Sequence, residues 1–280
     1  MNPLSTTARA RTRRGWPIGA YLCAAIILLF FLFPILYLIN SGLKSPAEFT
    51  RNPIGLVQHP ELGNFAEAWQ KGHFAAYLLN TVLYTFFGAT GATILSMLLG
   101  FPLARGYIGG LRLWNGMLAA LLFLPNALVA QFQLLLALGL YNTRVGYIIM
   151  CAVGVGVGPL LFRGYAQSIP KELDEAAAVD GASYWRYLWT FVFPLARPAL
   201  VTIFILNCVW MWNEVILGTV LFASQAKWPI ATGLNAFKGL YSTNWPLLAA
   251  ATMIVAIPLI VVYVFIQKYL VNGVVGAVKG

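Results

Sequence analysis

The chain has 280 residues, of which 60% are hydrophobic and 9% charged, and its mean hydropathy is +0.77. Soluble globular proteins carry about 25% charged residues. This composition therefore excludes a soluble enzyme, a nucleic-acid-binding domain and a disordered chain. The net charge of +10 is typical of a membrane protein with basic cytoplasmic segments, and we expect an all-α, polytopic membrane protein. The three cysteines lie within apolar runs, which disfavours a disulfide framework.

Residues 1–18 form a basic segment with four arginines, followed by the first apolar run. A cleavable signal peptide begins in a similar way. This apolar run is longer than the apolar region of a signal peptide, however, and no small-x-small cleavage site follows it. We therefore predict a retained N-terminal segment on the cytoplasmic side.

Long apolar stretches that carry almost no charge follow one another along the chain. About 20 apolar residues are needed for a helix to cross the hydrocarbon core. The sequence predicts one membrane domain over 19–268 and a cytoplasmic tail over 269–280. Six transmembrane helices are expected within this domain, at about 19–40, 78–100, 115–137, 146–164, 198–221 and 247–267.

The basic residues predict the orientation of these helices. With the N-terminus in the cytoplasm, twelve of the 18 Lys and Arg residues fall inside and six fall outside. Cytoplasmic segments are the ones enriched in Lys and Arg, so both termini are predicted to be cytoplasmic. The six outside residues are Lys44, Arg51, Lys71, Arg144, Lys227 and Lys238.

The inside segment 163–197 is too long for a bare turn and holds four of the eight acidic residues. Pro170 suits the first turn of a helix, where acidic side chains are also favoured. Gly181 can take the left-handed conformation that ends such a helix. Ser183 can cap a second short helix that Pro194 closes. The segment predicts a helix-turn-helix on the cytoplasmic face; the alternative is an amphipathic connector that lies on the membrane and docks nothing.

The residues Glu175-Ala176-Ala177, Asp180-Gly181-Ala182 and Pro194 resemble the EAA loop of permeases in binding-protein-dependent ABC importers. The C-terminal residues 269–280 are similar to the end of the smaller permease in maltose-type carbohydrate importers. With the six spans and the triplet Trp212-Asn213-Glu214, the resemblance covers nearly the whole chain. This chain differs from the family pattern at Phe191 and Phe193, where the family usually has aliphatic residues. Both side chains remain large and apolar, so we expect the loop to pack as it does in the family.

The resemblance implies that the EAA loop, 165–197, is a coupling loop that sits in a groove on a separate ATPase subunit. The implied coupling residues are Glu172, Glu175, Ala176, Ala177, Asp180, Gly181, Ala182 and Pro194, and the implied tail contacts are Gly276, Lys279 and Gly280. The chain has no Gly-x-x-x-x-Gly-Lys phosphate loop. We therefore expect a transport subunit with no catalytic residues and no bound cofactor, with ATP and Mg²⁺ on the partner ATPase.

The family pattern also implies the partners: a second permease in a heterodimer, an ATPase dimer, an extracytoplasmic binding protein, a sugar and the lipids of a bacterial inner membrane, with no nucleic acid. A glycerol-phosphate or polyol-type solute is the alternative. A phosphate would require Arg or Lys within the spans, and their absence away from the span ends favours a neutral sugar. An ion-driven transporter would need further intramembrane charges or an inverted repeat, and an intramembrane enzyme would need a nucleophile and base.

Glu214 is the one acidic residue within a predicted span. Such a residue normally faces a cavity or a partner. Asn207, Trp210 and Glu214 share a helical face, with Asn213 beside it, and in the third span Asn126 and Gln133 share another. Amides, a carboxylate and an aromatic face suit a hydroxyl-rich solute. The competing interpretation is that these polar residues hydrogen-bond helices together.

Two other features have ordinary explanations. The glycine-rich run 154–159 in the fourth span indicates close helix packing or, alternatively, a gating hinge. His59 and His73 lie outside the spans and fourteen positions apart, so no metal site is predicted.

Overall fold

The computed structural model of the chain describes residues 18–124, 127–238 and 243–278, with no side chain described at 266 or at 268–278. The described residues are almost entirely helical, and a single β-bridge, between Lys238 and Thr243, is the extent of β-structure among them. The all-α prediction is therefore confirmed. The α-helices are α1 Ile18–Gly42, α2 Pro46–Arg51, α3 Gly63–Lys71, α4 Phe74–Arg105, α5 Leu111–Leu121, α6 Leu128–Ala137, α7 Arg144–Val153, α8 Gly158–Gln167, α9 Glu172–Val179, α10 Tyr184–Tyr187, α11 Phe193–Leu195, α12 Arg197–Trp212, α13 Ile216–Leu221 and α14 Trp245–Val278; η1 Leu188–Val192 is π-helical, and η2 Gln225–Lys227 and η3 Thr232–Phe237 are 3₁₀ helices.

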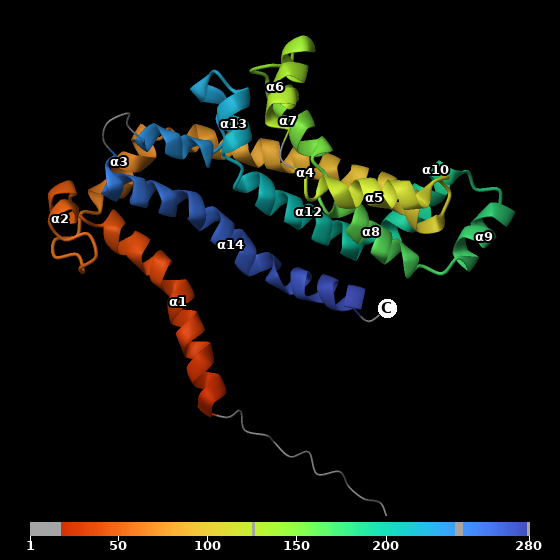
Figure 1. Cartoon of the computed structure of the whole chain (residues 1–280), viewed down its shortest axis with the longest axis horizontal. Coiled ribbons are helices and arrows are strands. Elements are labelled where there is room, and N and C mark those ends of the chain that lie inside the picture. The colour runs from red at the N-terminus through yellow and green to blue at the C-terminus, as the bar shows by residue number, and fades with distance from the viewer. Residues whose placement is uncertain (1–17, 125–126, 239–242, 279–280) are drawn as a thin grey trace, which may run out of the picture.

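Helix α4 is the centre of the bundle, and it packs against α7, α8 and α12 (Figure 1). Small residues line its buried face and let the neighbouring backbones approach closely. A Cβ atom on Gly100 would lie 2.6 Å from the carbonyl oxygen of Pro159 on α8. A Cβ atom on Gly158 would lie 2.2 Å from Oγ of Ser96 on α4. The glycine-rich run therefore does serve close packing.

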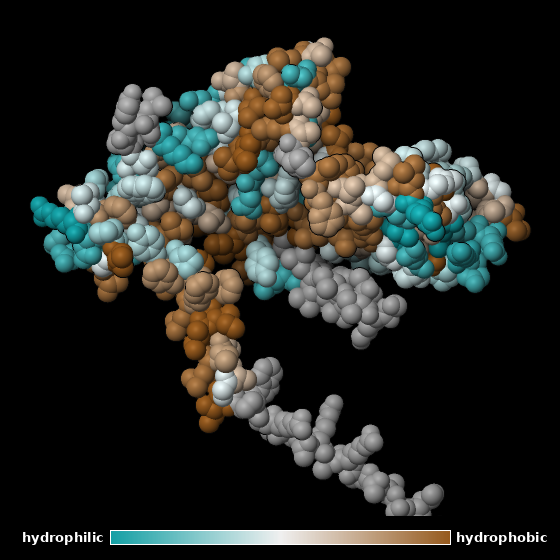
Figure 2. Space-filling model, viewed as in Figure 1, coloured by the Kyte–Doolittle hydropathy of each residue, from teal (hydrophilic) through white to brown (hydrophobic). Residues whose placement is uncertain are grey.

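The bundle has two opposite ends (Figure 1). The α3 end holds α2, α3 and the beginning of α4; the α9 end holds the last turn of α4 and the pair α9–α10. In the view of Figure 2, hydrophilic residues gather at both ends and apolar residues cover the region between them. This distribution suits a protein whose middle lies in a bilayer.

Among the described residues, α1, α4 and α14 are each long and apolar enough to cross a membrane, and up to five spans result if each bent helix pair is one span. The pair α7–α8 bends by 45°, where Gly156 has φ 48°. The second pair, which joins 184–195 to α12, bends by 80°. The predicted count of six spans stays a prediction.

Three predicted spans are not single helices: 146–164, which is the bent pair α7–α8, and two others. The range 115–137 contains α5 and α6, which are separated by 122–127, and 125–126 lie outside the described residues. The range 198–221 contains α12 and α13, separated by 213–215. Here two polar side chains end one helix and begin the next: Asn213 Nδ2 donates back to the carbonyl of Val209, and Glu214 Oε1 accepts from the N–H of Leu217.

Helix α1 diverges from the bundle towards its N-terminal end (Figure 1). Within the described part of the chain, no residue in the most apolar stretch of this helix is buried. Its last turn is an exception, because Gly42 lies against Ala250 of α14. The apolar side chains of α1 must therefore face lipid or another protein chain.

A buried lysine organises the α3 end. The side chain of Lys44 is fully buried. Its Nζ donates to the carbonyls of Asn52 at 2.8 Å and Pro53 at 3.2 Å, and also to that of Gly55. Asn64 Nδ2 in turn donates to the Lys44 carbonyl at 2.9 Å. Together these bonds close the loop that carries α2.

Replacing Lys44 with methionine is expected to destabilise the protein by about 3 kcal/mol, because three part-buried carbonyls lose a charged donor while the apolar stem is retained. The thermal-unfolding midpoint should then fall by about 6–12 °C. Lys71→Met is the control, because Lys71 forms an exposed ion pair with Glu67 and such pairs contribute little. Equal midpoints for the two variants would contradict the proposed role of Lys44.

Candidate functional site

The α9–α10 loop is the first candidate site, and its turn has the geometry that the sequence predicts. Gly181 has φ 68°, which is the left-handed region. The N–H of Gly181 donates to Ala178 at 3.1 Å and that of Ala182 to Ala177 at 2.9 Å, so the last carbonyls of α9 are satisfied. Ser183 Oγ then accepts from the N–H of Arg186 and caps α10.

Most of the predicted coupling residues point away from the bundle. Glu172, Glu175, Ala176, Asp180, Gly181 and Pro194 are exposed. Beside them lies Val179, an apolar side chain that is 88% exposed in the described part of the chain. The result is a protruding surface with small and apolar residues at its tip and carboxylates around them.

Two of the predicted coupling residues lie inward instead. Ala177 is buried and Ala182 is half-buried, and both pack into an apolar cluster that includes Phe101 of α4 and Leu188. Because residues three to four positions apart share a helix face, α9 presents Glu172, Glu175 and Ala176 outward while Ala177 is its anchor. Of the predicted tail residues, Gly276 lies in α14 with no side-chain environment described, and Lys279 and Gly280 lie outside the described residues.

Sequence reasoning missed the principal polar contact of the loop. Asp174 forms an ion pair with Arg105, the last residue of α4, with 2.7 Å between Oδ2 and Nε. The hydroxyls of Tyr107 and Tyr187 also donate to the Asp174 carboxylate. Burial, followed by the hydrogen bond to Asp174, raises the pKa of Tyr187 to about 12 and also raises that of Tyr107. Both hydroxyls are therefore protonated donors at neutral pH.

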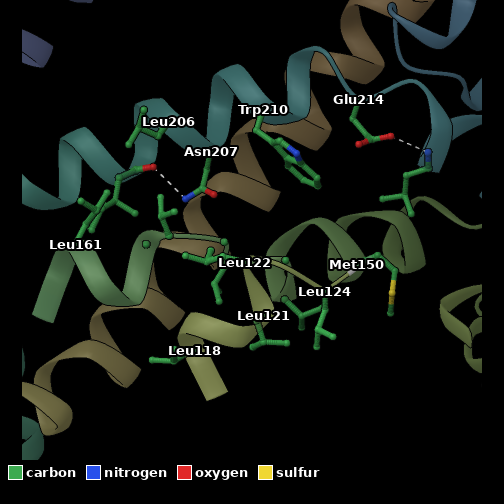
Figure 3. A pocket seen from close by; sticks show the side chains of 18 of the residues that line it. Leu118, Leu121, Leu122, Leu124, Met150, Leu161, Leu206, Asn207, Trp210 and Glu214 are labelled. Atoms are coloured by element: carbon green, nitrogen blue, oxygen red, sulfur yellow. Dashed lines mark hydrogen bonds between the residues drawn. The ribbon is translucent and has the colours of Figure 1, made fainter. Parts of the chain in front are cut away.

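The second candidate site is a cavity of about 590 Å³ within the helical region. Asn207 and Trp210 from α12, with Glu214 just after it, line one side of the cavity, opposite leucines of α5 and of the segment after α5 (Figure 3). The predicted stripe on the fifth span therefore does share one cavity. Asn207 Nδ2 donates to the carbonyl of Ile203 at 3.0 Å, and Trp210 is 44% exposed.

The other predicted path residues are not part of the described cavity lining. Gln133 and Asn213 are exposed, and Asn126 lies outside the described residues. Gln131 lines the cavity instead, and its Oε1 is buried with no hydrogen-bond partner among the described residues. The prediction assumed one continuous helix over 115–137. Because α6 is a separate helix that begins at Leu128, its side chains face other directions than they would in one continuous helix. Nothing in the spacing of the polar residues could have shown this.

Comparison with known proteins extends these observations. The family model described as the inner membrane component of binding-protein-dependent transport systems matches residues 21–276. The melibiose/raffinose/stachyose import permease protein MelC of Bacillus subtilis is 30% identical over 92% of this chain and 95% of that protein. The diacetylchitobiose uptake system permease protein NgcG of Streptomyces coelicolor is 32% identical over 87% and 82%.

A solved structure shows the same architecture. A chain from a bacterial ABC transporter involved in import of the acidic polysaccharide alginate superposes with a TM-score of 0.77. It is 25% identical in sequence, and the match covers 96% of this chain and 99% of that one. Family match, relatives and architecture agree over nearly the full length. The chain therefore belongs to the family of inner membrane components of binding-protein-dependent transport systems.

Proposed function

We propose that this chain is one of two unlike membrane subunits of an ATP-driven importer for a neutral sugar or oligosaccharide. The observation that carries the proposal is the α9–α10 loop, which presents an exposed acidic and apolar surface at one end of a membrane bundle. An ATPase dimer, which holds ATP and Mg²⁺, would dock on this surface. The family membership and the sugar-import names of the relatives support the same assignment.

The proposed orientation places the α9 end, with both termini, in the cytoplasm. The α3 end then faces outwards, where an extracytoplasmic binding protein would deliver the solute. The count of basic residues supports this: twelve of the 18 Lys and Arg residues, among them Arg105 and Lys171 at the α9 end, would be cytoplasmic, and six, among them Lys44 and Arg51 at the α3 end, would be outside. Cytoplasmic segments carry the larger share of Lys and Arg.

The cavity is the proposed part of the solute path in this subunit. Its lining among the described residues contains no Arg or Lys, which favours a neutral sugar over a phosphate ester. Gln131, Asn207 and Glu214 supply polar edges, and Trp210 supplies an aromatic face. The many leucines of the lining also suit contact with a second membrane subunit. If the solute bound elsewhere, the polar groups of the lining would instead hydrogen-bond helices together.

The test is purification of the tagged chain from its own host in a mild detergent, followed by mass spectrometry. A second polytopic subunit together with an ATPase is the expected result. Cells should take up at least one of radiolabelled raffinose, N,N′-diacetylchitobiose or an arabinooligosaccharide, and not glycerol 3-phosphate. A chain that purifies alone and moves solute in vesicles without ATP would contradict the proposal.

Replacing Trp210 with alanine is expected to raise the KM for uptake of the imported sugar about twofold to twelvefold, because the sugar loses an aromatic contact worth ~0.5–1.5 kcal/mol. Trp114→Ala is the matched control, because Trp114 is exposed to a similar degree, 40%, but lies outside the described cavity lining. Equal KM values in the two variants would remove Trp210 from the solute path.

A further inference from the structure

The contact between Asp174 and Arg105 is a buried junction between the loop and the central helix. Besides the 2.7 Å ion pair, Arg105 Nη2 donates to Asp174 Oδ1 at 3.0 Å. The two side chains are only 2% and 13% exposed. A buried charge that loses its partner is strongly destabilised. The geometry therefore holds the first turn of α9 against the last residue of α4.

The same two side chains bind the segments before and after α9. Arg105 Nη1 donates to the carbonyl of Ile169 at 2.9 Å, just ahead of the helix. The Asp174 carboxylate accepts from Tyr187 of α10, beyond the turn at Gly181, and from Tyr107 at 3.1 Å. The loop is thus joined to α4 on both sides of its turn, while its outer face stays free of contacts with α4.

Helix α4 makes a second set of bonds at its opposite end. Tyr84 OH donates to the carbonyl of Lys227 at 2.9 Å, and Thr81 Oγ1 accepts from the N–H of Ile230 at 2.7 Å. Asn80 Nδ2 donates to the carbonyl of Ala226 at 2.9 Å. These partners belong to one segment, 226–230, at the α3 end. A single helix of 32 residues therefore connects this segment with the α9–α10 loop.

We propose that the Arg105–Asp174 junction is the joint through which movement of the α9–α10 loop reaches α4 and, at its far end, the segment 226–230. The inference rests on the proposed function, in which an ATPase moves this loop. Arg105 and Asp174 act as positioning residues: they contact neither solute nor nucleotide and keep α9 and α4 moving as one body. Tyr107 and Tyr187 support the carboxylate in that task.

The test measures the distance between α9 and α4 in the purified complex, reconstituted in nanodiscs. Spin labels are placed at Lys171→Cys, beside α9, and Leu99→Cys, on α4, with Cys23→Ser and Cys208→Ala to limit other labelling; Lys171 is exposed and Leu99 is 38% exposed. The distance between the two labels is measured by electron paramagnetic resonance, first without nucleotide and then with Mg²⁺ and a non-hydrolysable ATP analogue. The parent complex should give the same distance in both states.

In the Asp174→Asn variant, the distance is expected to change on nucleotide binding. Sugar uptake per ATP hydrolysed should fall at least about fivefold, the lower range of allosteric coupling. Asp174→Glu retains the charge and should restore most of the coupling. Tyr187→Phe should give a smaller loss, about threefold, whereas Tyr165→Phe, which removes a hydroxyl bond to Leu195 in the same cluster, should change neither readout.

A distance that changes with nucleotide in the parent complex would overturn the inference. So would an Asp174→Asn complex that matches the parent in distance and in uptake per ATP. If Asp174→Asn does not assemble, the parent distances and the Tyr187→Phe and Tyr165→Phe pair decide the matter. Failure of the proposed function would be seen separately, as a parent complex that contains no ATPase subunit.

Discussion

Replacing Gly100 with alanine is expected to destabilise the protein by about 3 kcal/mol, a large effect for one added methyl group. The new Cβ would lie 2.6 Å from the carbonyl oxygen of Pro159 and 3.0 Å from Cβ of Phe162. Both belong to α8, and a backbone oxygen cannot turn away as a flexible side chain can. The two helices would have to separate along their whole contact.

The matched control is Gly164→Ala, on α8, where an added Cβ would meet nothing within 4 Å. Alanine there should be neutral or stabilising, because glycine costs about 1 kcal/mol in a helix interior. The measurement is the thermal-unfolding midpoint of each purified variant. Similar midpoints would mean that α4 and α8 do not approach as closely as described.

The helical regions could be predicted because hydropathy is a local property of the chain. Charge-free runs located α1, α4 and α14 as spanning helices. The break after Trp212 could not be predicted in this way, because it depends on which backbone group each side chain finds. Asn213 hydrogen-bonds back to Val209, and Glu214 hydrogen-bonds forward to Leu217. From the sequence alone, both side chains could equally have pointed into a cavity without breaking the helix.

In the α9–α10 loop, too, the features set by neighbouring residues could be predicted and the long-range contacts could not. The turn at Gly181 follows from local backbone preference. The pairing of Asp174 with Arg105 joins residues 69 positions apart, so it depends on how α4 and α9 meet. Read along α9 alone, Asp174 is one of three acidic residues favoured near a helix N-terminus. Only the fold distinguishes this inward carboxylate from the outward ones of Glu172 and Glu175.

That distinction makes Glu175 the residue whose change should affect partner binding with the least effect on the fold. It is exposed on α9, and no hydrogen bond or ion pair of its side chain is found among the described residues. Glu175→Lys reverses the charge of the proposed docking surface. If this carboxylate pairs with a basic group in the ATPase groove, binding should weaken at least about thirtyfold, the loss expected at a central interface residue.

The measurement is the amount of ATPase subunit that co-purifies with each variant, together with the thermal-unfolding midpoint of the chain. Glu67→Lys is the control, because it reverses an exposed carboxylate at the opposite end, where Glu67 pairs with Lys71. Loss of the ATPase from Glu175→Lys at an unchanged midpoint would locate the docking surface on α9. Retention of the ATPase by both variants would contradict docking at Glu175. If binding is lost, a charge reversal on the ATPase that restores binding to Glu175→Lys would identify the opposing basic residue.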